Sequence, residues 1–243
     1  MEHKTTVHII GAGVSGLIAA YELEQAGYHP VVFEKQGNCG GRIQTVTVTD
    51  YELDLGFQVL LSAYPLAKKY LDLEALSLRK LQSGAQILVD GKRFLIGDPL
   101  RDWKVLLPTL FSEIGSLTDK LRVLKLSLLL RKKSLDDIFS TPEVSTLDYL
   151  KTFGFSNKII TRFFQPFFAG IFLETGLQTS SRMFEFVYKM FGEGHAMIPQ
   201  RGIGAISEQL KAKLVQTTFK FNCEVQALTD TTITLTNGED ISH

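Results

Sequence analysis

Two glycine-rich segments stand close together near the N-terminus, and both could bring backbone N–H groups against phosphate. The first has the pattern G-x-G-x-x-G at Gly11, Gly13 and Gly16, and the second reads CGGR over residues 39–42. Glycines in the first pattern permit a tight turn, close approach of the backbone to a pyrophosphate, and close packing of a helix on a strand. The phosphates would then meet the free N–H groups and the positive dipole end of that helix, at Val14 and Ser15. The pattern predicts a dinucleotide site.

Charged side chains follow each glycine segment. Glu34, followed by Lys35, ends the apolar run PVVFE, where a carboxylate can accept hydrogen bonds from a ribose 2′-hydroxyl and would repel a 2′-phosphate. Arg42 places a planar cation beside the first loop. A site for NAD needs no second glycine loop, whereas the longer FAD gains from extra cover over its pyrophosphate and ribityl chain. The two segments together therefore favour FAD.

The surrounding sequence supplies the elements that would position these loops. Residues 6–10 predict a strand, and apolar residues recur at helical spacing over 14–26, ahead of Gly27. The continuous apolar run at 30–34 is typical of a parallel strand buried on both faces. These three segments predict a βαβ unit.

The remaining chain alternates between strand and helix patterns. Strand pairs are expected at 44–56 and 85–96, the latter turning at Asp90-Gly91. Helices are expected at 65–76, 103–133 with an interruption at Pro108, 145–151, 156–165, 180–191 and, after a glycine loop, within 198–214. Strand alternation then returns, with a turn at Asn237-Gly238. We predict an α/β fold: a Rossmann-like FAD-binding sheet domain over 1–76 and 196–243, interrupted by a largely helical substrate or cap insert over 77–195.

Composition narrows the class of protein. Of 243 residues 44% are hydrophobic, and Lys+Arg 26 balances Asp+Glu 26, so no charge excess suggests a nucleic-acid partner. The two cysteines and five histidines lack metal-ligand spacing, and no metal site is predicted. No signal peptide is evident, and no apolar run reaches the roughly 18 residues that a membrane span needs. We expect a cytoplasmic protein, with membrane association as an alternative.

The stretch HIIGAGVSGLIAAYELEQAGYHPVVFEK, followed by GGRIQT, resembles the N-terminal signature of the flavin-containing amine oxidoreductase superfamily. This superfamily includes monoamine and polyamine oxidases, protoporphyrinogen oxidases and phytoene desaturases. The resemblance implies FAD bound to the GR2 type of Rossmann-like domain. It does not imply an amine substrate.

The resemblance also implies roles for individual residues. In the family a GGR-x-x-T element contacts FAD, and Gly40, Gly41, Arg42 and Thr45 match it. A D-x-G-x-Q/H element lies near the flavin, and a valine in a late strand meets the adenine with its backbone. These features correspond to Asp54, Gly56, Phe57 and Gln58, and to Val225. A further P-x-G-G-like loop is matched only in part, by Pro199, Gly202 and Gly204.

Relatives in this superfamily continue well past the point that corresponds to His243, so we expect the chain to be C-terminally truncated. The lysine that several relatives keep near flavin N5 usually lies in that later part. No catalytic residue is therefore predicted.

Two apolar segments each allow two interpretations. The Phe-rich residues 162–172 could line a substrate pocket, although core packing is the preferred interpretation. Residues 117–133 carry leucines on one predicted helix face and Lys and Arg on the other. This pattern could serve peripheral membrane contact, although packing on the protein's own domain is more common.

These observations favour an FAD-dependent oxidoreductase that passes a hydride from an organic, apolar substrate to flavin N5. The alternatives are a non-catalytic or incomplete dinucleotide-binding chain and an NAD-dependent Rossmann dehydrogenase. The electron acceptor, the oligomeric state and the identity of the substrate are not predicted.

Overall fold

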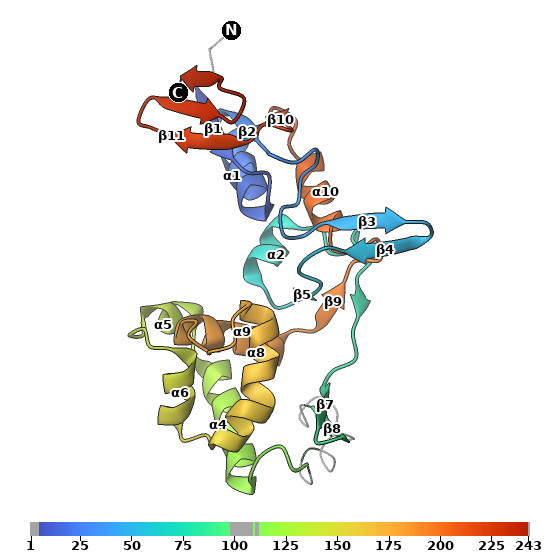
Figure 1. The fold of residues 1–243 in the computed structure, drawn as a ribbon, viewed down its shortest axis with the longest axis vertical. Coiled ribbons are helices and arrows are strands. Elements are labelled where there is room, and N and C mark those ends of the chain that lie inside the picture. The colour runs from blue at the N-terminus through green and yellow to red at the C-terminus, as the bar shows by residue number, and fades with distance from the viewer. Residues whose placement is uncertain (1–4, 98–108, 110–111, 243) are drawn as a thin grey trace. The chain divides into compact units, whose positions relative to one another are not determined.

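The computed structural model describes residues 5–97, 109 and 112–242, and it divides into two compact units (Figure 1). The first unit comprises residues 1–60, 64–80 and 197–243, and the second comprises 61–63 and 81–196. Three short strands, β5 (Leu60–Leu61), β9 (Ala196–Ile198) and β6 (Arg79–Lys80), pair in the order β5-β9-β6.

A parallel sheet forms the centre of the first unit. Strand β1 (Thr6–Ile10) pairs with β2 (His29–Phe33), and β10 (Thr218–Lys220) pairs with the other edge of β2. Helix α1 (Val14–Gln25) connects β1 to β2 and completes a βαβ unit, and Gly27 follows the helix with φ +88°. The bounds agree with the sequence expectation to within one residue, and the predicted α/β fold class is confirmed.

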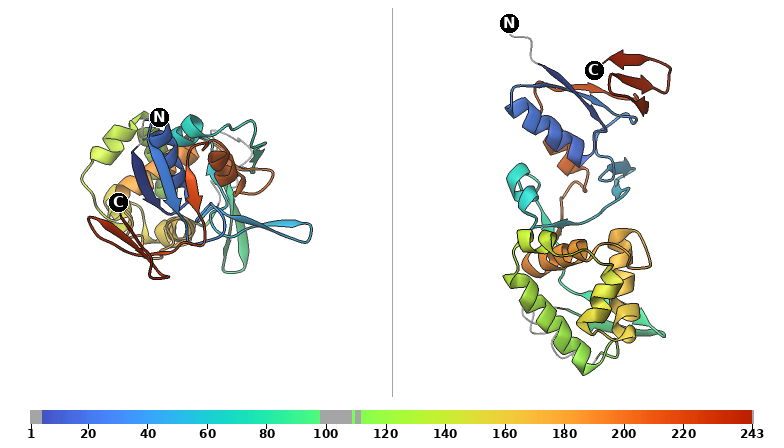
Figure 2. Two further views of the ribbon diagram at one scale, coloured as in Figure 1. Left: turned by 90° about the horizontal axis from the view of Figure 1, so that it is seen from above. Right: turned by 90° about the vertical axis from the view of Figure 1, so that its left-hand side faces the viewer.

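Each face of this sheet is covered by a different layer (Figure 2). Helix α1 and helix α10 (Ala205–Ala212) cover one face through a shared apolar cluster that includes Leu17, Val32 and Leu210. The other face packs through Val31 and Phe33 against an antiparallel sheet of β11 (Val225–Leu228), β12 (Thr232–Leu235) and β13 (Asp240–Ser242). Burial of β2 from both sides explains its unbroken apolar sequence.

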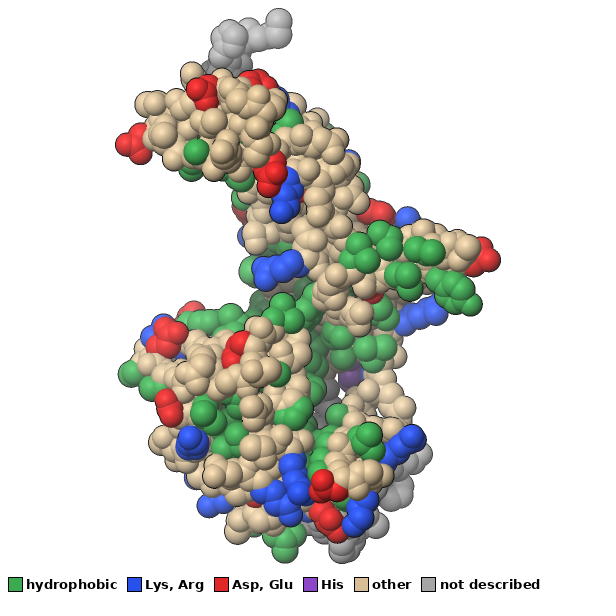
Figure 3. All heavy atoms as spheres, in the orientation of Figure 1, with side chains coloured by type: hydrophobic (Ala, Val, Ile, Leu, Met, Phe, Trp, Pro, Cys, Tyr) green, Lys and Arg blue, Asp and Glu red, His purple; other side chains and the backbone are tan. Residues whose placement is uncertain are grey.

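A two-faced hairpin follows the second glycine segment. Strand β3 (Thr45–Val48) pairs with β4 (Tyr51–Asp54), so that Thr45 lies opposite Asp54 and Val48 opposite Tyr51. Because side chains alternate along a strand, Thr45, Thr47, Glu52 and Asp54 share one face, and Val46, Val48, Tyr51 and Leu53 share the other. Figure 3 shows the apolar side chains gathered on this hairpin, where Tyr51 is 71% exposed.

The helix expected at 65–76 is shorter than predicted. Helix α2 (Pro65–Tyr70) ends where Leu71 becomes extended. The Asp72 carboxylate then accepts hydrogen bonds from the backbone N–H groups of Glu74 and Ala75, at 3.1 and 3.0 Å. Gln209 of α10 also bonds both backbone groups of Asp72, at 2.9 Å each. A side-chain-capped turn and a tertiary contact thus replace the last helical turn.

The second unit is mainly helical. A hairpin, β7 (Ala85–Val89) and β8 (Lys92–Ile96), turns at Asp90 and Gly91, which both have positive φ as this turn requires. The helices that follow are α4 (Leu117–Lys132), α5 (Leu135–Ser140), α6 (Thr146–Phe153), α7 (Asn157–Ile159), the π-helix η2 (Ile160–Phe164), α8 (Gln165–Phe172) and α9 (Ser181–Glu193). The first part of the helix expected at 103–133, including Pro108, lies outside the described residues.

Serine side chains set the starts of most of these helices. The hydroxyl of the residue before the helix accepts a backbone N–H in α4, α5, α6, α7 and α9. At Ser116 and Ser134 the carboxylate of an aspartate three residues later accepts the backbone N–H of the serine, which completes a capping box. These serines therefore mark where five of the helices begin.

Phenylalanines fill the core of the second unit. Phe164, Phe168 and Phe184 are at most 1% exposed, and the ring of Phe164 lies 4.9 Å from that of Phe155 between centroids. The partly buried Phe163, Phe167 and Phe172 pack against the same cluster. The preferred interpretation of residues 162–172 as core is confirmed.

Helix α4 buries some of its leucines and exposes others. Leu126 and Leu130 are buried, but Leu117 and Leu121 are 64% and 66% exposed. Membrane contact through residues 117–133 stays a prediction, as does a cytoplasmic location. Among the described residues, every helix is too short or too polar to span a bilayer.

Two leucines of α4 provide a matched test of the helical core. Leu126 is fully buried and Leu128 is 46% exposed on the same helix. Leu126→Ala should lower the free energy of unfolding by about 2–5 kcal/mol, because the cavity is not refilled. Leu128→Ala should lower it by less than about 1 kcal/mol. Urea titration monitored by circular dichroism measures both, and equal losses would contradict the assigned burial of α4.

Asp119 gives the second unit a predictable response to acid. Its carboxylate accepts bonds from the backbone and hydroxyl groups of Ser116 and Ser156, at 2.7–2.9 Å. Burial alone would raise the pKa of Asp119, but these hydrogen bonds outweigh it and lower the pKa from 3.8 to about 2. The folded state therefore binds this proton less readily than the unfolded state does.

Stability from Asp119 should accordingly be complete above about pH 5 and lost as pH falls from about 4 to about 2. Asp119→Asn should be less stable than the parent chain at pH 7, and the difference should shrink over that interval. Denaturant titrations at a series of pH values measure it. A difference that stays constant down to about pH 2 would show that the carboxylate is not held as described.

Candidate functional site

The first glycine loop joins β1 to α1 within the first unit. Gly11 has φ +95° and donates its N–H to Phe33 O at 2.7 Å, which ties the loop to the end of β2. A Cβ on Gly16 would lie 2.0 Å from Gly11 O, so only glycine allows the helix to approach the loop this closely. The role predicted for Gly16 is thus visible in the packing of the helix on the strand.

The N-terminus of α1 is open to an anion. Gly13 precedes the helix, no side chain caps it, and its first turn carries no acidic residue. A Cβ on Gly13 would meet no atom within 4 Å, so the space in front of this backbone is open. Val14 is half-buried and Ser15 is exposed. The helix dipole and these amides fit a pyrophosphate.

Glu34 ties the end of β2 to the first loop. Its buried carboxylate accepts hydrogen bonds from Ala12 N at 2.7 Å and from Gln36 N at 2.9 Å. A carboxylate has about four acceptor positions, so a ribose hydroxyl can still bond to it. Lys35 is exposed beside it. Glu34 thus shapes the loop, a role that the sequence interpretation did not include.

The second glycine loop lies directly against the first. Gly40 forms a β-bridge with Gly13 and donates its N–H to Ala12 O at 2.9 Å. A Cβ on Gly41 would lie 3.3 Å from Gly13 Cα. Residues separated by 27 positions in the sequence therefore share one surface, and any side chain at Gly41 would crowd the loop in front of it.

Arg42 adds a positively charged side chain to the second glycine loop. Its side chain is exposed, and it makes no hydrogen bond or ion pair with the described part of the chain. A guanidinium that is free of protein partners is suited to a bidentate contact with phosphate.

The D-x-G-x-Q element packs against the main chain of Arg42. Phe57 donates its N–H to Arg42 O at 3.0 Å, and a Cβ on Gly56 would lie 2.2 Å from the same oxygen. Gly56, Phe57 and Gln58 are all exposed. The structure therefore brings this element to the second glycine loop and leaves its surface open.

Val225 follows a segment that is hydrogen-bonded to Glu34. Cys223 donates its N–H to Glu34 O at 2.9 Å, and β11 begins two residues later at Val225. Val225 is half-buried and packs on the apolar cluster behind β2. No contact in the described structure joins Val225 to the glycine loops directly.

Thr45 and Asp54 connect these loops to the N-terminus of α10. The Thr45 hydroxyl donates to Asp54 Oδ1 at 2.5 Å and accepts from Gly204 N at 2.8 Å. Asp54 Oδ1 also accepts from Ile203 N at 2.9 Å. The sequence interpretation assigned Thr45 to the cofactor and gave residues 202–204 no role. The partial P-x-G-G match was the signal for them.

Cys39 precedes the second loop, and burial raises the pKa of its thiol. The nearby Glu34 carboxylate raises that pKa further, whereas Lys211 lowers it. The thiol is therefore neutral near pH 7 and is not an activated nucleophile. The described residues hold no group of three or more His, Cys, Asp or Glu side chains that could bind a metal ion.

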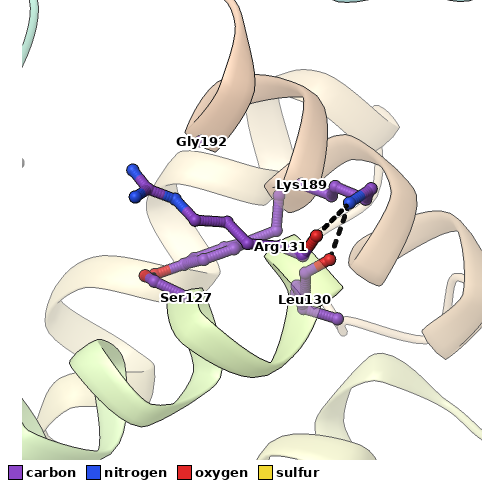
Figure 4. A pocket seen from close by; sticks show the side chains of 6 residues that line it. Ser127, Leu130, Arg131, Lys189 and Gly192 are labelled. Atoms are coloured by element: carbon purple, nitrogen blue, oxygen red, sulfur yellow. Dashed lines mark hydrogen bonds between the residues drawn. The ribbon is translucent and has the colours of Figure 1, made fainter. Parts of the chain in front are cut away.

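A small pocket in the second unit lies between α4 and α9 (Figure 4). Lys189 crosses it and donates to Leu130 O at 2.8 Å and Arg131 O at 3.1 Å, and it pairs with Glu193 at 2.5 Å. These carbonyls end α4, so the ammonium caps a helix C-terminus. We therefore assign this lysine a structural role.

Known proteins share both the sequence and the fold of this chain. The sequence profile of the family "Flavin containing amine oxidoreductase" matches residues 14–243. Protoporphyrinogen oxidase 2 of Arabidopsis thaliana, a chloroplastic and mitochondrial protein, is 30% identical over 169 residues, which are 68% of this chain and 32% of that protein. The chain thus spans about a third of the length of this relative.

Solved structures match almost the whole chain. An oxidoreductase from Methanosarcina mazei aligns with a TM-score of 0.66 at 21% identity, over 98% of this chain and 57% of its own. Putrescine oxidase bound to putrescine aligns with a TM-score of 0.66 at 17% identity, over 98% of this chain and 56% of its own. At these identities the likeness shows the shared fold.

The fold and the adjoining glycine loops agree with these comparisons. The profile covers nearly all of the chain, including the second glycine loop and the α10 loop. This protein therefore belongs to the flavin-containing amine oxidoreductase family, which confirms the predicted resemblance and FAD as the cofactor.

Proposed function

We propose that this chain binds FAD along its two adjoining glycine loops and serves an oxidoreductase that passes a hydride from an apolar organic substrate to flavin N5. The observation that carries the proposal is the pairing of an uncapped helix N-terminus with an uncommitted arginine. Both stand at one surface built from Gly13, Gly40 and Gly41.

The residues at this surface would divide the binding of FAD among them. The N–H groups that open α1 and the Arg42 guanidinium would hold the pyrophosphate, because both attract negative charge. Glu34 would accept a hydrogen bond from the ribose, and the exposed Gly56, Phe57 and Gln58 would lie toward the flavin. The bound flavin supplies the hydride acceptor, whereas the protein binds and orients it.

An apolar substrate is supported by the name of one relative. The protein from Arabidopsis thaliana that matches most of this chain is a protoporphyrinogen oxidase. The Phe-rich segment that first suggested an apolar substrate no longer supports it, because Phe164 and Phe168 are core residues. The fold alone does not fix the substrate, since one fold can carry many activities.

The proposed function is tested by purifying the full-length protein, denaturing it and recording the flavin spectrum of the supernatant. Bound FAD would be released and recognised by its absorbance and fluorescence. Titration with FAD and, separately, with NAD would then rank the two cofactors. A full-length protein that releases no flavin and ignores added FAD would support a non-catalytic dinucleotide-binding chain instead, and preference for NAD would support the dehydrogenase alternative.

Arg42→Ala should weaken FAD binding about 10- to 100-fold, because a charge-assisted phosphate contact contributes roughly 1.5–3 kcal/mol. Arg79→Ala removes an exposed arginine on β6 of the same unit and should leave FAD binding unchanged. Fluorescence titration with FAD measures both variants. Equal affinities in the Arg42 variant and the parent chain would show that the guanidinium does not contact the cofactor.

Gly13→Ala and Gly16→Ala separate cofactor binding from folding. A Cβ on Gly13 meets nothing within 4 Å, and the residue has φ −74°, so the variant should keep its thermal stability. The added methyl group would occupy the space proposed for the pyrophosphate and should abolish most FAD binding. Gly16→Ala should lose both FAD binding and stability, because its Cβ would lie 2.0 Å from Gly11 O. Normal FAD affinity in Gly13→Ala would rule out this placement of the pyrophosphate.

A further inference from the structure

Two helices begin beside the glycine loops, and the loops that lead into them are held differently. The N-terminus of α1 has no side-chain cap. Helix α10 has no side-chain cap either, but in the loop just before it Asp54 Oδ1 accepts Ile203 N at 2.9 Å and Thr45 Oγ1 accepts Gly204 N at 2.8 Å. Protein groups therefore accept the amides of Ile203 and Gly204, and those of Ala205 and Ile206 donate to Gly202 O and Ile203 O. The amides that begin α1 are open to a ligand.

The two side chains that hold this loop also bond to each other. Thr45 and Asp54 lie opposite each other at the base of the β3–β4 hairpin, and the Thr45 hydroxyl donates to Asp54 Oδ1 at 2.5 Å. Since a hydroxyl has one proton and two acceptor positions, Thr45 can donate to Asp54 and accept from Gly204 at once. We call the unit of Thr45, Asp54 and the amides of Ile203 and Gly204 the threonine latch.

The loop that the threonine latch holds has no room for a side chain at Gly202 or Gly204. A Cβ on Gly202 would lie 2.4 Å from Thr45 Oγ1 and 2.8 Å from Asp54 Oδ1. A Cβ on Gly204 would lie 2.8 Å from Thr45 N. Both glycines are buried, and Ile203 between them is 1% exposed in the main apolar cluster of the first unit. The fit between loop and strand is therefore specific for glycine.

The threonine latch reaches the cofactor surface through Gly40. Strand β3 begins three residues after Arg42, and a Cβ on Gly40 would lie 3.2 Å from Ser207 Oγ in the first turns of α10. Ser207 in turn donates to Gly204 O at 2.8 Å. Gly40 thus lies between the N-terminus of α10 and Gly13, with which it forms a bridge.

We infer that Thr45 and Asp54 are positioning residues, which hold the second glycine loop at the pyrophosphate surface by fixing it between α10 and the first loop. This inference rests on the proposed FAD site. On this view Thr45 affects FAD binding indirectly, by holding Gly40 and Arg42 in place. It does not contact the cofactor, because the Thr45 hydroxyl already has two protein partners.

The test compares three variants of the hairpin in the full-length protein. Thr45→Val keeps the shape and strand preference of threonine but removes the hydroxyl, and Thr45→Ser restores it. Thr47→Val is the matched control, since Thr47 lies on the same face of the hairpin and makes no hydrogen bond to the α10 loop in the described structure. Thr45→Val should weaken FAD binding about tenfold, whereas Thr45→Ser and Thr47→Val should bind FAD as the parent chain does.

Amide hydrogen exchange of Ile203 and Gly204 without FAD gives a second readout, which does not depend on the cofactor. Exchange at these two amides should be faster in Thr45→Val and unchanged in Thr47→Val. Asp54→Ala should reproduce both effects. The double variant Thr45→Val/Asp54→Ala should have the same FAD affinity and exchange rates as either single variant, because each single substitution already disrupts the threonine latch.

The outcomes separate this inference from the proposed function. If the parent protein does not bind FAD, the proposed function fails, and with it the positioning role, even if exchange still reports the latch. If FAD binds and Thr45→Val speeds exchange without weakening binding, the positioning role is overturned and the proposed function stands. Loss of FAD binding that Thr45→Ser does not rescue would also overturn it.

Discussion

Everything at the cofactor surface depends on the close approach of two backbone segments, around Gly13 and Gly40. They form a β-bridge, and Gly40 donates its N–H to Ala12 O at 2.9 Å. On the side of the second loop this approach leaves no room for side chains at Gly40 and Gly41. A Cβ on Gly41 would press on Gly13, and one on Gly40 would lie 2.7 Å from Ile43 O. Gly40 and Gly41 are therefore needed for packing, whereas the open space at Gly13 leaves room for a ligand.

The rest of the first unit fixes this approach from three directions. The parallel pairing of β1 and β2 brings Glu34 under the first loop, where its carboxylate accepts Ala12 N. The β3–β4 hairpin holds the strand that leaves the second loop, and α10 supports that loop from the side. Because these elements satisfy one another, the N-terminus of α1 and the Arg42 guanidinium are left without a protein partner among the described residues. These positive groups together make a site that attracts a pyrophosphate.

Local patterns predicted the elements whose stability is local. The apolar run of β2 and the glycines around α1 specify the βαβ unit, and Asp90-Gly91 specifies its own turn. Helix α2 was predicted too long because the residues after Tyr70 bond to Asp72 and to Gln209 of α10, a contact that no local pattern reveals. The exposed leucines of α4 show the same limit, since helical spacing does not state which side a neighbour covers.

The residues of the candidate site also fall into those that local sequence identifies and those whose role depends on tertiary contacts. The glycine motifs and Glu34 carry their signal in spacing, so the sequence identified them. Thr45 and Asp54 were identified as members of motifs, but their partners Ile203 and Gly204 lie about 150 positions away. A role defined by such a contact depends on tertiary structure. Glu34 shows that a residue can both shape a loop and keep acceptor positions for a ligand.

The most direct test of this account is amide hydrogen exchange across the first unit, measured with and without saturating FAD. We predict that FAD slows exchange at the amides of residues 13–16 and 40–42 and leaves those of Ile203 and Gly204 nearly unchanged, because Asp54 and Thr45 already accept these two amides. FAD binding that leaves exchange at residues 13–16 and 40–42 unaltered would contradict the central claim that the paired glycine loops hold the cofactor.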